Sequence, residues 1–279
     1  MSATFAGIGA LVLWSVLALL SRLAAGVPPL QLTAMSFGVA GTLGLVVLAL
    51  RGDLGALRQK PIAWLHGIGG LFGYHALYFA ALAYAPAVEA NLLNYLWPLL
   101  IVLFAGPILG MRLGARRLTG VALGFAGCAL LLGGGVNFPA DAWFGFLCAV
   151  GCAVVWALYS VLAKRLSSVP TAAVVGFCAG AAMLALLAHL AVEPSVVPDG
   201  RQWVAALLLG LGPIGAAFFL WDIGMKRGDP RLLGTLAYAV PVASTLLLIA
   251  TGEGRMGWNV MAALALVVGG GWLAATAKA

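Results

Sequence analysis

The residues between Pro86 and Pro98 gather much of the polar and aromatic chemistry of this chain. The stretch reads PAVEANLLNYLWP and holds a carboxylate, two amides, a phenol and an indole within thirteen residues. On a helix, spacings of three, four and seven residues share one face. That face would carry Asn91, Asn94, Tyr95 and Pro98. Amides and phenols bind polar solutes through hydrogen bonds, whereas covalent catalysis requires a nucleophile beside its base. The stretch therefore predicts half of a substrate site rather than a catalytic motif.

The chain around this stretch is overwhelmingly apolar. Hydrophobic residues make up 63% of its 279 residues, charged residues make up 8%, and the mean hydropathy is +1.09. Soluble domains carry about 25% charged residues. Ten charge-free windows each reach the roughly 20 residues that cross a bilayer core as a helix. The windows are 1–21, 23–50, 61–88, 90–111, 118–140, 142–163, 166–192, 202–221, 232–252 and 256–277. The sequence predicts an all-α membrane protein with ten transmembrane helices.

The charged residues lie in the connections between these windows and report their orientation. Twelve of the fifteen Lys and Arg residues fall in connections on one side of the membrane, and three fall on the other. Cytoplasmic connections are the ones enriched in Lys and Arg, so both termini are expected in the cytoplasm. The net charge of +7 is therefore attributed to the Lys and Arg residues that orient the chain in the membrane. No nucleic-acid partner is expected, because the charges do not cluster on a soluble face.

Two further features fit a mature membrane protein. Residues 1–21 lack the basic start of a signal peptide, and nine similar segments follow, so they are read as the first helix. Cys148 and Cys152 share a helix face, but no His, Asp or Glu joins them at metal-ligand spacing. We expect the four cysteines to be packing residues, and we expect neither a metal nor a cofactor.

An internal repeat relates the two halves of the chain. Four landmarks recur at an offset of 142 or 143 residues. They are Trp14 with Trp156, Arg22 with Lys164, the motif Tyr95–Pro98 with Tyr238–Pro241, and Gly110 with Gly252. Each half, 1–137 and 138–279, would hold five helices. An odd number of helices makes the halves enter the membrane in opposite directions, which is typical of transporters whose substrate site lies between inverted repeats.

Four aromatic residues fall well inside their predicted spans, away from the headgroup belts where Trp and Tyr often lie. They are Trp14, Tyr78, Trp156 and Tyr159. We expect these side chains to form the walls of a cavity, with Asn94 and Tyr95 supplying hydrogen bonds. Further candidates for the cavity are His75, Trp97, Trp221 and Tyr238. His75 fits a hydrogen-bonded packing role equally well, and the direction of Trp97 depends on a helix kink.

The prolines and the few charged residues near the spans receive other roles. Pro98 and Pro241 are expected to kink matching helices of the two halves and to act as hinges. Glu89 fits a cap at a helix start or an outer gate. Asp222 lies four residues before Lys226, the spacing of an intrahelical ion pair, which is favoured over a proton relay. Lys164 is expected to cap the inner end of its helix.

The absence of central charges and of catalytic groups limits the classes of function that the sequence supports. No span carries a carboxylate or cation at its centre, although ion-coupled carriers and exporters of cationic drugs often need one. No enzyme constellation of nucleophile and base, paired carboxylates or metal ligands is visible. A cavity lined by Trp, Tyr, Asn and Ser suits a neutral or zwitterionic solute with a flat apolar body.

Several motifs, together with the ten spans and the inverted repeat, resemble a known family. The motifs are Leu13-Trp14-Ser15, Glu89 followed by Asn94-Tyr95-Leu96-Trp97-Pro98, Trp156-Ala157-Leu158-Tyr159, Trp221-Asp222-Ile223-Gly224 and Tyr238-Ala239-Val240-Pro241. Over nearly the whole length the chain resembles the EamA-type branch of the drug/metabolite transporter superfamily, most of all the YddG aromatic amino acid exporters. The second half departs from the first by lacking counterparts of Asn94 and Trp97, so polar recognition is expected to depend on the first half.

The resemblance implies a multi-pass exporter of aromatic and other bulky neutral amino acids in a bacterial inner membrane. Without a central charge, we expect facilitative alternating access. The alternatives are a broader multidrug or cationic-amine exporter and an intramembrane enzyme acting on lipid. The expected partners are a small-molecule substrate and the lipid bilayer. Glycines at 120, 124, 127 and 269–271 mark the fifth and tenth spans as a scaffold or dimer face, so the chain would be a monomer or weak homodimer.

Overall fold

The computed structural model describes residues 2–132, 139–251 and 257–277, and these ranges fold as helices without a β-strand. The first half consists of α1 (Ser2–Ser15), α2 (Leu17–Leu23), α3 (Pro29–Leu50), a 3-10 turn (Leu54–Leu57), α4 (Pro61–Tyr84), α5 (Ala87–Asn94), α6 (Trp97–Leu109) and α7 (Ala115–Leu132). The all-α expectation is confirmed for the described residues. The expected boundary between the halves, at 137/138, lies outside them.

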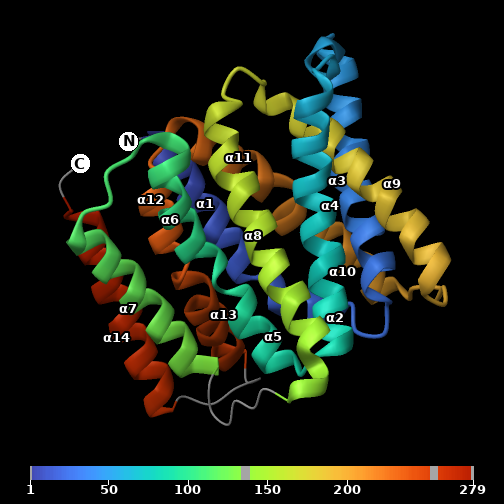
Figure 1. Ribbon diagram of the computed structural model, residues 1–279. Coiled ribbons are helices and arrows are strands. Elements are labelled where there is room, and N and C mark those ends of the chain that lie inside the picture. Colours follow the sequence, from blue (N-terminus) through green and yellow to red (C-terminus); the bar gives the residue numbers. More distant parts are fainter. Residues whose placement is uncertain (1, 133–138, 252–256, 278–279) are drawn as a thin grey trace.

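The second half repeats this pattern of long and divided helices. It consists of a 3-10 turn (Ala140–Ala142), α8 (Trp143–Arg165), a 3-10 turn (Thr171–Ala173), α9 (Val174–Val192), α10 (Gly200–Leu211), a π-helical segment (Gly212–Ala216), α11 (Ala217–Arg227), α12 (Pro230–Leu236), α13 (Ala239–Ala250) and α14 (Trp258–Ala275). In Figure 1, α1 runs away from the end of the molecule that carries the N-terminus, whereas α8 runs towards that end.

Among the residues that the structure describes, six stretches of helix are long and apolar enough to cross a membrane. They are Ala3–Leu23, Pro29–Leu50, Glu89–Leu109, Ala140–Arg165, Thr171–Val192 and Gly200–Arg227. Exposed side chains along them, such as those of Leu43, Leu147 and Leu187, suit contact with lipid. The crossing of the membrane by all ten expected spans stays a prediction, as does the side on which the termini lie.

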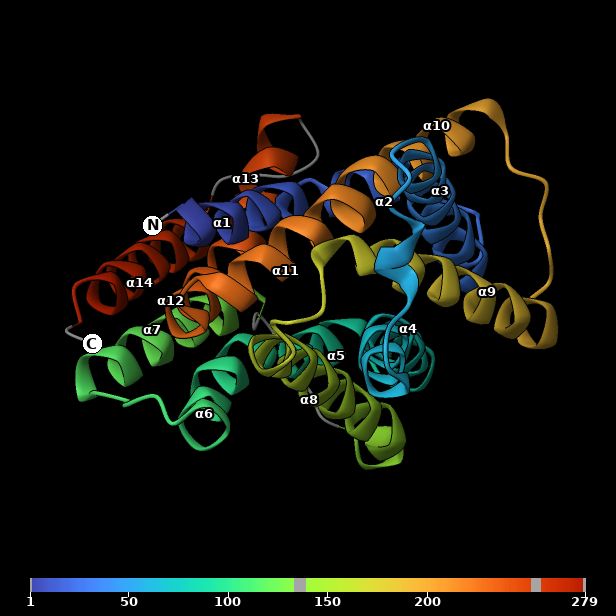
Figure 2. The ribbon, with the colours of Figure 1, turned by 90° about the horizontal axis from the view of Figure 1, so that it is seen from above.

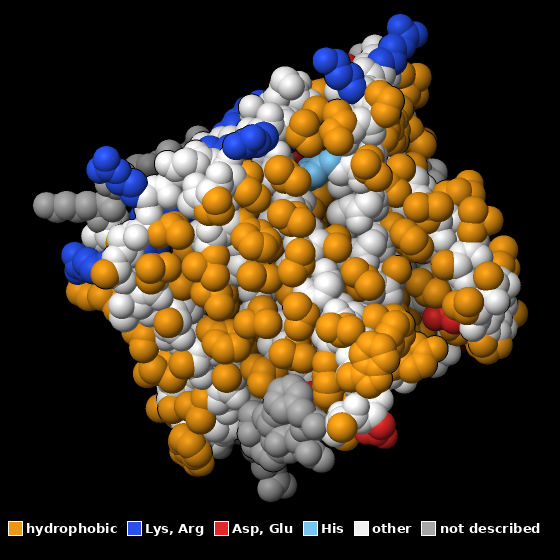
Figure 3. Space-filling model, in the orientation of Figure 1, with side chains coloured by type: hydrophobic (Ala, Val, Ile, Leu, Met, Phe, Trp, Pro, Cys, Tyr) orange, Lys and Arg blue, Asp and Glu red, His pale blue; other side chains and the backbone are white. Residues whose placement is uncertain are grey.

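Charge is distributed unevenly along the long axis of the helices. Figure 3 shows Lys and Arg side chains at the upper end of the molecule, where Figure 1 also places both ends of the chain, and a broad hydrophobic surface below them. Arg51, Arg58 and Lys60 form part of this basic end, and all three are exposed. We call it the basic end throughout.

Two of the helix interruptions follow from proline chemistry. A proline has no N–H for the carbonyl four residues earlier, and its ring clashes with that carbonyl. Pro98 lies four residues after Asn94, where α5 ends, and Pro241 lies four residues after Ala237, where α12 is capped. The two prolines therefore divide α5 from α6 and α12 from α13 at matching places in the two halves.

A seam of glycines joins the last helices of the two halves. A side chain at Gly120 on α7 would place its Cβ 2.6 Å from the backbone oxygen of Gly270 on α14, and a side chain at Gly270 would collide with the oxygen of Gly120 in turn. Gly127 approaches the oxygen of Ala263 in the same way. Small residues allow membrane helices this close an approach. In the described chain these glycines therefore join α7 to α14 within one molecule (Figure 2).

Candidate functional site

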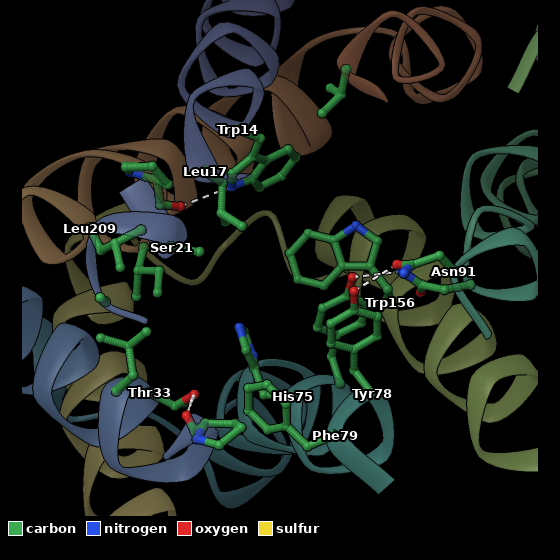
Figure 4. Close-up of a pocket in the computed structure, with 18 of the residues that line it drawn as sticks. Trp14, Leu17, Ser21, Thr33, His75, Tyr78, Phe79, Asn91, Trp156 and Leu209 are labelled. Carbon is green, nitrogen blue, oxygen red and sulfur yellow. Dashed lines mark hydrogen bonds between the residues drawn. The ribbon is translucent and has the colours of Figure 1, made fainter. Parts of the chain in front are cut away.

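A cavity of about 570 Å³ opens between the helices near the centre of the molecule, within the range of about 300–1,000 Å³ that is common for small-molecule sites. It is lined by several residues each from α2, α3, α4, α5 and the π-helical segment, and by single residues from α1, α6, α8, α10, α11 and α13. Figure 4 places Tyr78, Asn91 and Trp156 on one side of the cavity and Ser21 and Leu209 on the opposite side. No lining residue is Asp, Glu, Lys or Arg.

The polar side of the cavity consists of two tyrosines on α4 that face two asparagines on α5. The Tyr78 hydroxyl donates to Asn91 Oδ1 at 2.6 Å, and Asn94 Nδ2 donates to the Tyr74 hydroxyl at 3.1 Å. The two phenol rings stack nearly parallel, with centroids 6.1 Å apart and an interplanar angle of 7°. Cys152 on α8 donates its thiol to Asn94 Oδ1 at 3.3 Å. Each amide is thereby held at a fixed orientation.

His75 adds a hydrogen-bond acceptor beside the tyrosines. Its Nδ1 lies 2.7 Å from the backbone oxygen of Leu71, and because a carbonyl oxygen only accepts, Nδ1 carries the hydrogen. In the neutral ring, Nε2 is then an acceptor. Figure 4 shows the His75 ring pointing into the cavity, and Phe37 packs edge-on against it with ring centroids 5.2 Å apart.

Indole rings close the cavity on the side of the basic end. Trp14 packs against Trp156 and Trp221, with ring centroids 5.6 and 5.0 Å away, and Trp97 completes the group. Edge-to-face aromatic pairs contribute about 0.5–1.5 kcal/mol each beyond the burial of their area. Trp14 Nε1 donates to the backbone oxygen of Pro213 at 2.9 Å, which fixes this ring against the π-helical segment. The cavity lining continues in the other direction to Ala24 and Val27, at the α2–α3 connection.

Most of the residues predicted for the cavity lie on its surface. They are Trp14, His75, Tyr78, Asn94, Tyr95, Trp97 and Trp156. Three others do not line it. Tyr159 stacks on Trp156 at 5.2 Å and on His66 at 4.8 Å, deeper towards the basic end. Trp221 is buried behind Trp14 and donates to Ser160 Oγ at 3.0 Å. Tyr238 turns away towards Gly124 and Phe125 on α7.

The residues predicted as gates or caps make structural contacts. Asp222 forms the predicted ion pair with Lys226, with Oδ2 and Nζ 2.8 Å apart, and accepts the hydroxyl of Thr171 at 2.6 Å. Glu89 lies in the first turn of α5 and is buried. Lys164 Nζ donates to the backbone oxygen of Gly228 at 2.7 Å, which ties α8 to the turn between α11 and α12.

A second charged cluster lies at this same turn. Asp229 caps the start of α12, contacts Arg231 through two hydrogen bonds, and lies 3.7 Å from Arg117. Burial by itself would raise the pKa of Asp229, but the hydrogen bonds and positive charges of these arginines outweigh it and hold the pKa below its usual value. The carboxylate is therefore ionised and structural.

The structure adds cavity residues that the sequence reasoning did not select. Tyr74 completes the pair with Asn94, and Phe79, Thr33 and Phe218 contribute to the walls. Asn91, which belongs to the predicted polar face of residues 86–98, also lines the cavity. Tyr74 lies four residues before Tyr78 on the same helix, so helical spacing is the signal that could have identified it. No group of three metal-ligating side chains is found in the part of the chain that the structure describes, and the four cysteines are buried thiols.

Known proteins share both the sequence pattern and the fold of this chain. The pattern of the EamA-like transporter family matches residues 1–133 and again residues 143–276. The aromatic amino acid exporter YddG of Ancylobacter novellus is 50% identical over 273 residues, which cover 96% of this chain and 95% of that protein. The protein of the same name from Salmonella typhimurium is 27% identical, over 88% and 87% of the two chains.

A solved structure agrees with the arrangement of the helices. A protein crystal structure with 49% sequence identity superimposes with a TM-score of 0.94, covering 98% of this chain and 96% of that one. The double family match confirms the two repeats that the matched landmarks indicate. It also confirms the resemblance that the sequence motifs carry.

Proposed function

Because the chain belongs to the EamA-like transporter family, we propose that it exports aromatic and other bulky neutral amino acids across a bacterial inner membrane. It is a multi-pass membrane protein. The relatives named as aromatic amino acid exporters support the substrate class. The observation that carries the proposal is the cavity itself, whose lining combines indole and phenol rings with two amides and contains no formally charged side chain.

The lining offers complementary partners for each part of a zwitterionic aromatic amino acid. The flat side chain would stack on Trp156 and Trp14, where ring faces and edges are both available. The carboxylate would accept hydrogen bonds from the Asn94 amide and the Tyr74 hydroxyl, since a hydroxyl that accepts one bond retains its own hydrogen. The ammonium group would donate to His75 Nε2, with cation–π attraction from the indole rings.

The proposed mechanism is alternating access about this cavity. Ten transmembrane helices would form two five-helix repeats of opposite orientation, with both termini in the cytoplasm. With the basic end inside, the cavity would open outward past the α2–α3 connection, and the indole rings would separate it from the cytoplasm. Pro98 and Pro241 would serve as hinges, because the helices are already interrupted beside them. A monomer is sufficient for this cycle.

A cavity without a charged side chain predicts facilitative movement. Purified protein in liposomes should carry labelled tryptophan or phenylalanine down its concentration gradient at the same rate with and without a pH difference. Coupling to protons would need a titratable group that changes its exposure during the cycle, and such groups are normally carboxylates within the membrane. Strict dependence of uptake on a proton gradient would disprove facilitative movement while leaving the substrate class intact.

A competition panel separates this proposal from a multidrug or cationic-amine exporter. Unlabelled phenylalanine and tyrosine should compete with labelled tryptophan, whereas aromatic amines that lack the carboxylate should compete weakly. The amines lose the hydrogen bonds to Asn94 and Tyr74, and they would place an uncompensated positive charge in a cavity without a carboxylate. Stronger competition by the amines would favour the alternative function.

A further inference from the structure

A second opening lies on the outside of the helices, behind the wall of the central cavity. It is a groove of about 420 Å³ between α3, α9 and the segment that runs from α10 through the π-helical turns into α11. Figure 2 shows α3 beside both α9 and α10, remote from the glycine seam of α7 and α14. The lining comprises Ala40, Leu43, Gly44, Val47, Leu48, Arg51, Ala172, Val175, Gly210, Leu211, Gly215, Ala216 and Phe219.

The groove and the central cavity share the π-helical segment as a partition. Pro213 and Ile214 face the cavity, whereas Gly215 and Ala216 line the groove. The backbone oxygen of Pro213 holds the indole of Trp14 through a 2.9 Å hydrogen bond. π-helical turns within a helix are frequent at functional sites. A ligand in the groove would therefore contact the π-helical segment on the face that points away from the cavity. This segment holds Trp14 in the cavity wall.

The chemistry of the groove changes along its length. Its body is entirely apolar, and Leu43, Val47 and Leu211 are each about half exposed, as expected of side chains that meet lipid. One charged side chain lines it, that of Arg51, where α3 ends at the basic end of the molecule. Arg51 is exposed, and its side chain forms no ion pair or hydrogen bond with any residue that the structure describes.

We propose that the groove binds one acyl chain of an anionic phospholipid, with the phosphate at Arg51. An apolar channel that faces the bilayer fits an acyl chain, and an unpaired guanidinium at the membrane surface attracts anionic headgroups and can bind a phosphate through two hydrogen bonds. The bound chain would support the partition from behind and stabilise Trp14 in its cavity position. Lipid binding here does not depend on the identity of the transported substrate.

Native mass spectrometry of the full chain, delipidated and then titrated with phosphatidylglycerol or phosphatidylcholine, tests the headgroup site. Wild-type protein should bind phosphatidylglycerol more tightly, and Arg51→Gln should reduce that preference about fivefold, since one surface cation contributes about a factor of five. Arg58→Gln removes an exposed charge nearby that does not line the groove, and it should retain the preference. Equal binding of the two lipids by the wild type, or an unchanged preference in Arg51→Gln, would overturn the proposal.

A second pair of variants tests whether the groove binds the acyl chain. Ala216→Leu places a larger side chain in the groove and should lower phosphatidylglycerol binding, whereas Ala122→Leu, at an exposed position on α7, should not. Hydrogen exchange reports on the partition in the wild type. Amides of residues 208–219 should exchange more slowly in vesicles containing phosphatidylglycerol than in phosphatidylcholine vesicles, and this difference should vanish in Arg51→Gln. Exchange that does not respond to lipid composition would exclude support of the partition by the bound chain.

Discussion

Asn94 is hydrogen-bonded to two neighbouring helices at the edge of the cavity. Its Nδ2 donates to Tyr74 on α4, and its Oδ1 accepts the thiol of Cys152 on α8, so one side chain links three helices at the edge of the proposed substrate site. The second amide hydrogen remains for a substrate carboxylate. This arrangement makes Asn94 the residue at which loss of a single polar group should affect transport most.

Asn94→Ala should lower the uptake of labelled tryptophan into liposomes roughly tenfold, because a lost buried hydrogen bond costs about 1–3 kcal/mol. Asn259→Ala provides the control, since it removes an amide on α14, outside the cavity lining. The amount of protein in the membrane should match wild type for both variants. Uptake by Asn94→Ala at the wild-type rate would remove this residue from the site.

Trp156→Ala should abolish uptake while leaving membrane expression intact. The indole of Trp156 faces the cavity and contacts Trp14, Tyr74 and Tyr159, so its removal deletes a stacking surface. The same helix offers a matched control in Trp143, which is 60% exposed, and Trp143→Ala should transport normally. The two variants are compared by initial rates of phenylalanine uptake, and equal rates would contradict a stacking role.

Residue types and helical spacing predicted several residues that line the cavity, and their role in binding a substrate stays a prediction. Trp14, Tyr78, Asn94 and Trp156 were identified because they are polar or aromatic at depths where lipid-facing positions are aliphatic, and all four line the cavity. Tyr159 failed to reach the cavity for a geometric reason. It lies three residues after Trp156, on the same helix face but nearly one turn closer to the basic end, beneath the ring of Trp156.

At the scale of elements, each of the two prolines interrupts its helix at the carbonyl four residues earlier, to which it cannot donate a hydrogen bond. The sequence indicated kinks at Pro98 and Pro241, and the helices end about one turn earlier, at Asn94 and Leu236, because the missing N–H leaves the carbonyl four residues back without its partner. The π-helical segment could not be predicted from periodicity, because one extra residue per turn leaves the hydrophobic pattern of a wholly apolar helix unchanged.

Pro98→Ala and Pro241→Ala should each restore a helical hydrogen bond and favour a continuous helix. If the interruptions are hinges, turnover should fall roughly tenfold. An interior proline costs a helix about 3 kcal/mol, and stabilising the continuous helix by about half of that amount is enough for a tenfold change. The KM for tryptophan should change little, since neither proline lines the cavity. Pro107→Ala supplies the control, because Pro107 lies inside the unbroken α6. A rise in KM with unchanged turnover would contradict the hinge role.

At the scale of the molecule, the cavity and the charges both indicate that the cavity opens at the end opposite to the basic end. The indole rings and the Asp222–Lys226 ion pair lie towards the basic end, whereas the α2–α3 connection lies at the far end of the cavity lining. Composition and repeat spacing predicted the helical fold. The face at which the cavity opens was not predictable, because the hydrophobic pattern of the helices is compatible with an opening towards either side of the membrane.

Two serine-to-cysteine variants test this sidedness. In whole cells a membrane-impermeant thiol reagent should label Ser21→Cys, which lines the cavity, and saturating tryptophan should slow the reaction. Ser160→Cys should resist labelling, because Ser160 is fully buried beneath the indole rings. The background is low, since the native cysteines are all buried. Failure of Ser21→Cys to react with the reagent would show that the cavity does not open outward.

The glycine seam between α7 and α14 has a mechanical consequence. Backbone meets backbone there, so no change of side-chain rotamer can create space, and any sliding of one helix along the other would drive a carbonyl into a main chain. The last helices of the two repeats thus form a fixed frame to which both halves are attached. During the proposed transport cycle the two halves would therefore move about this pair of helices, whose closest contacts are made by glycines.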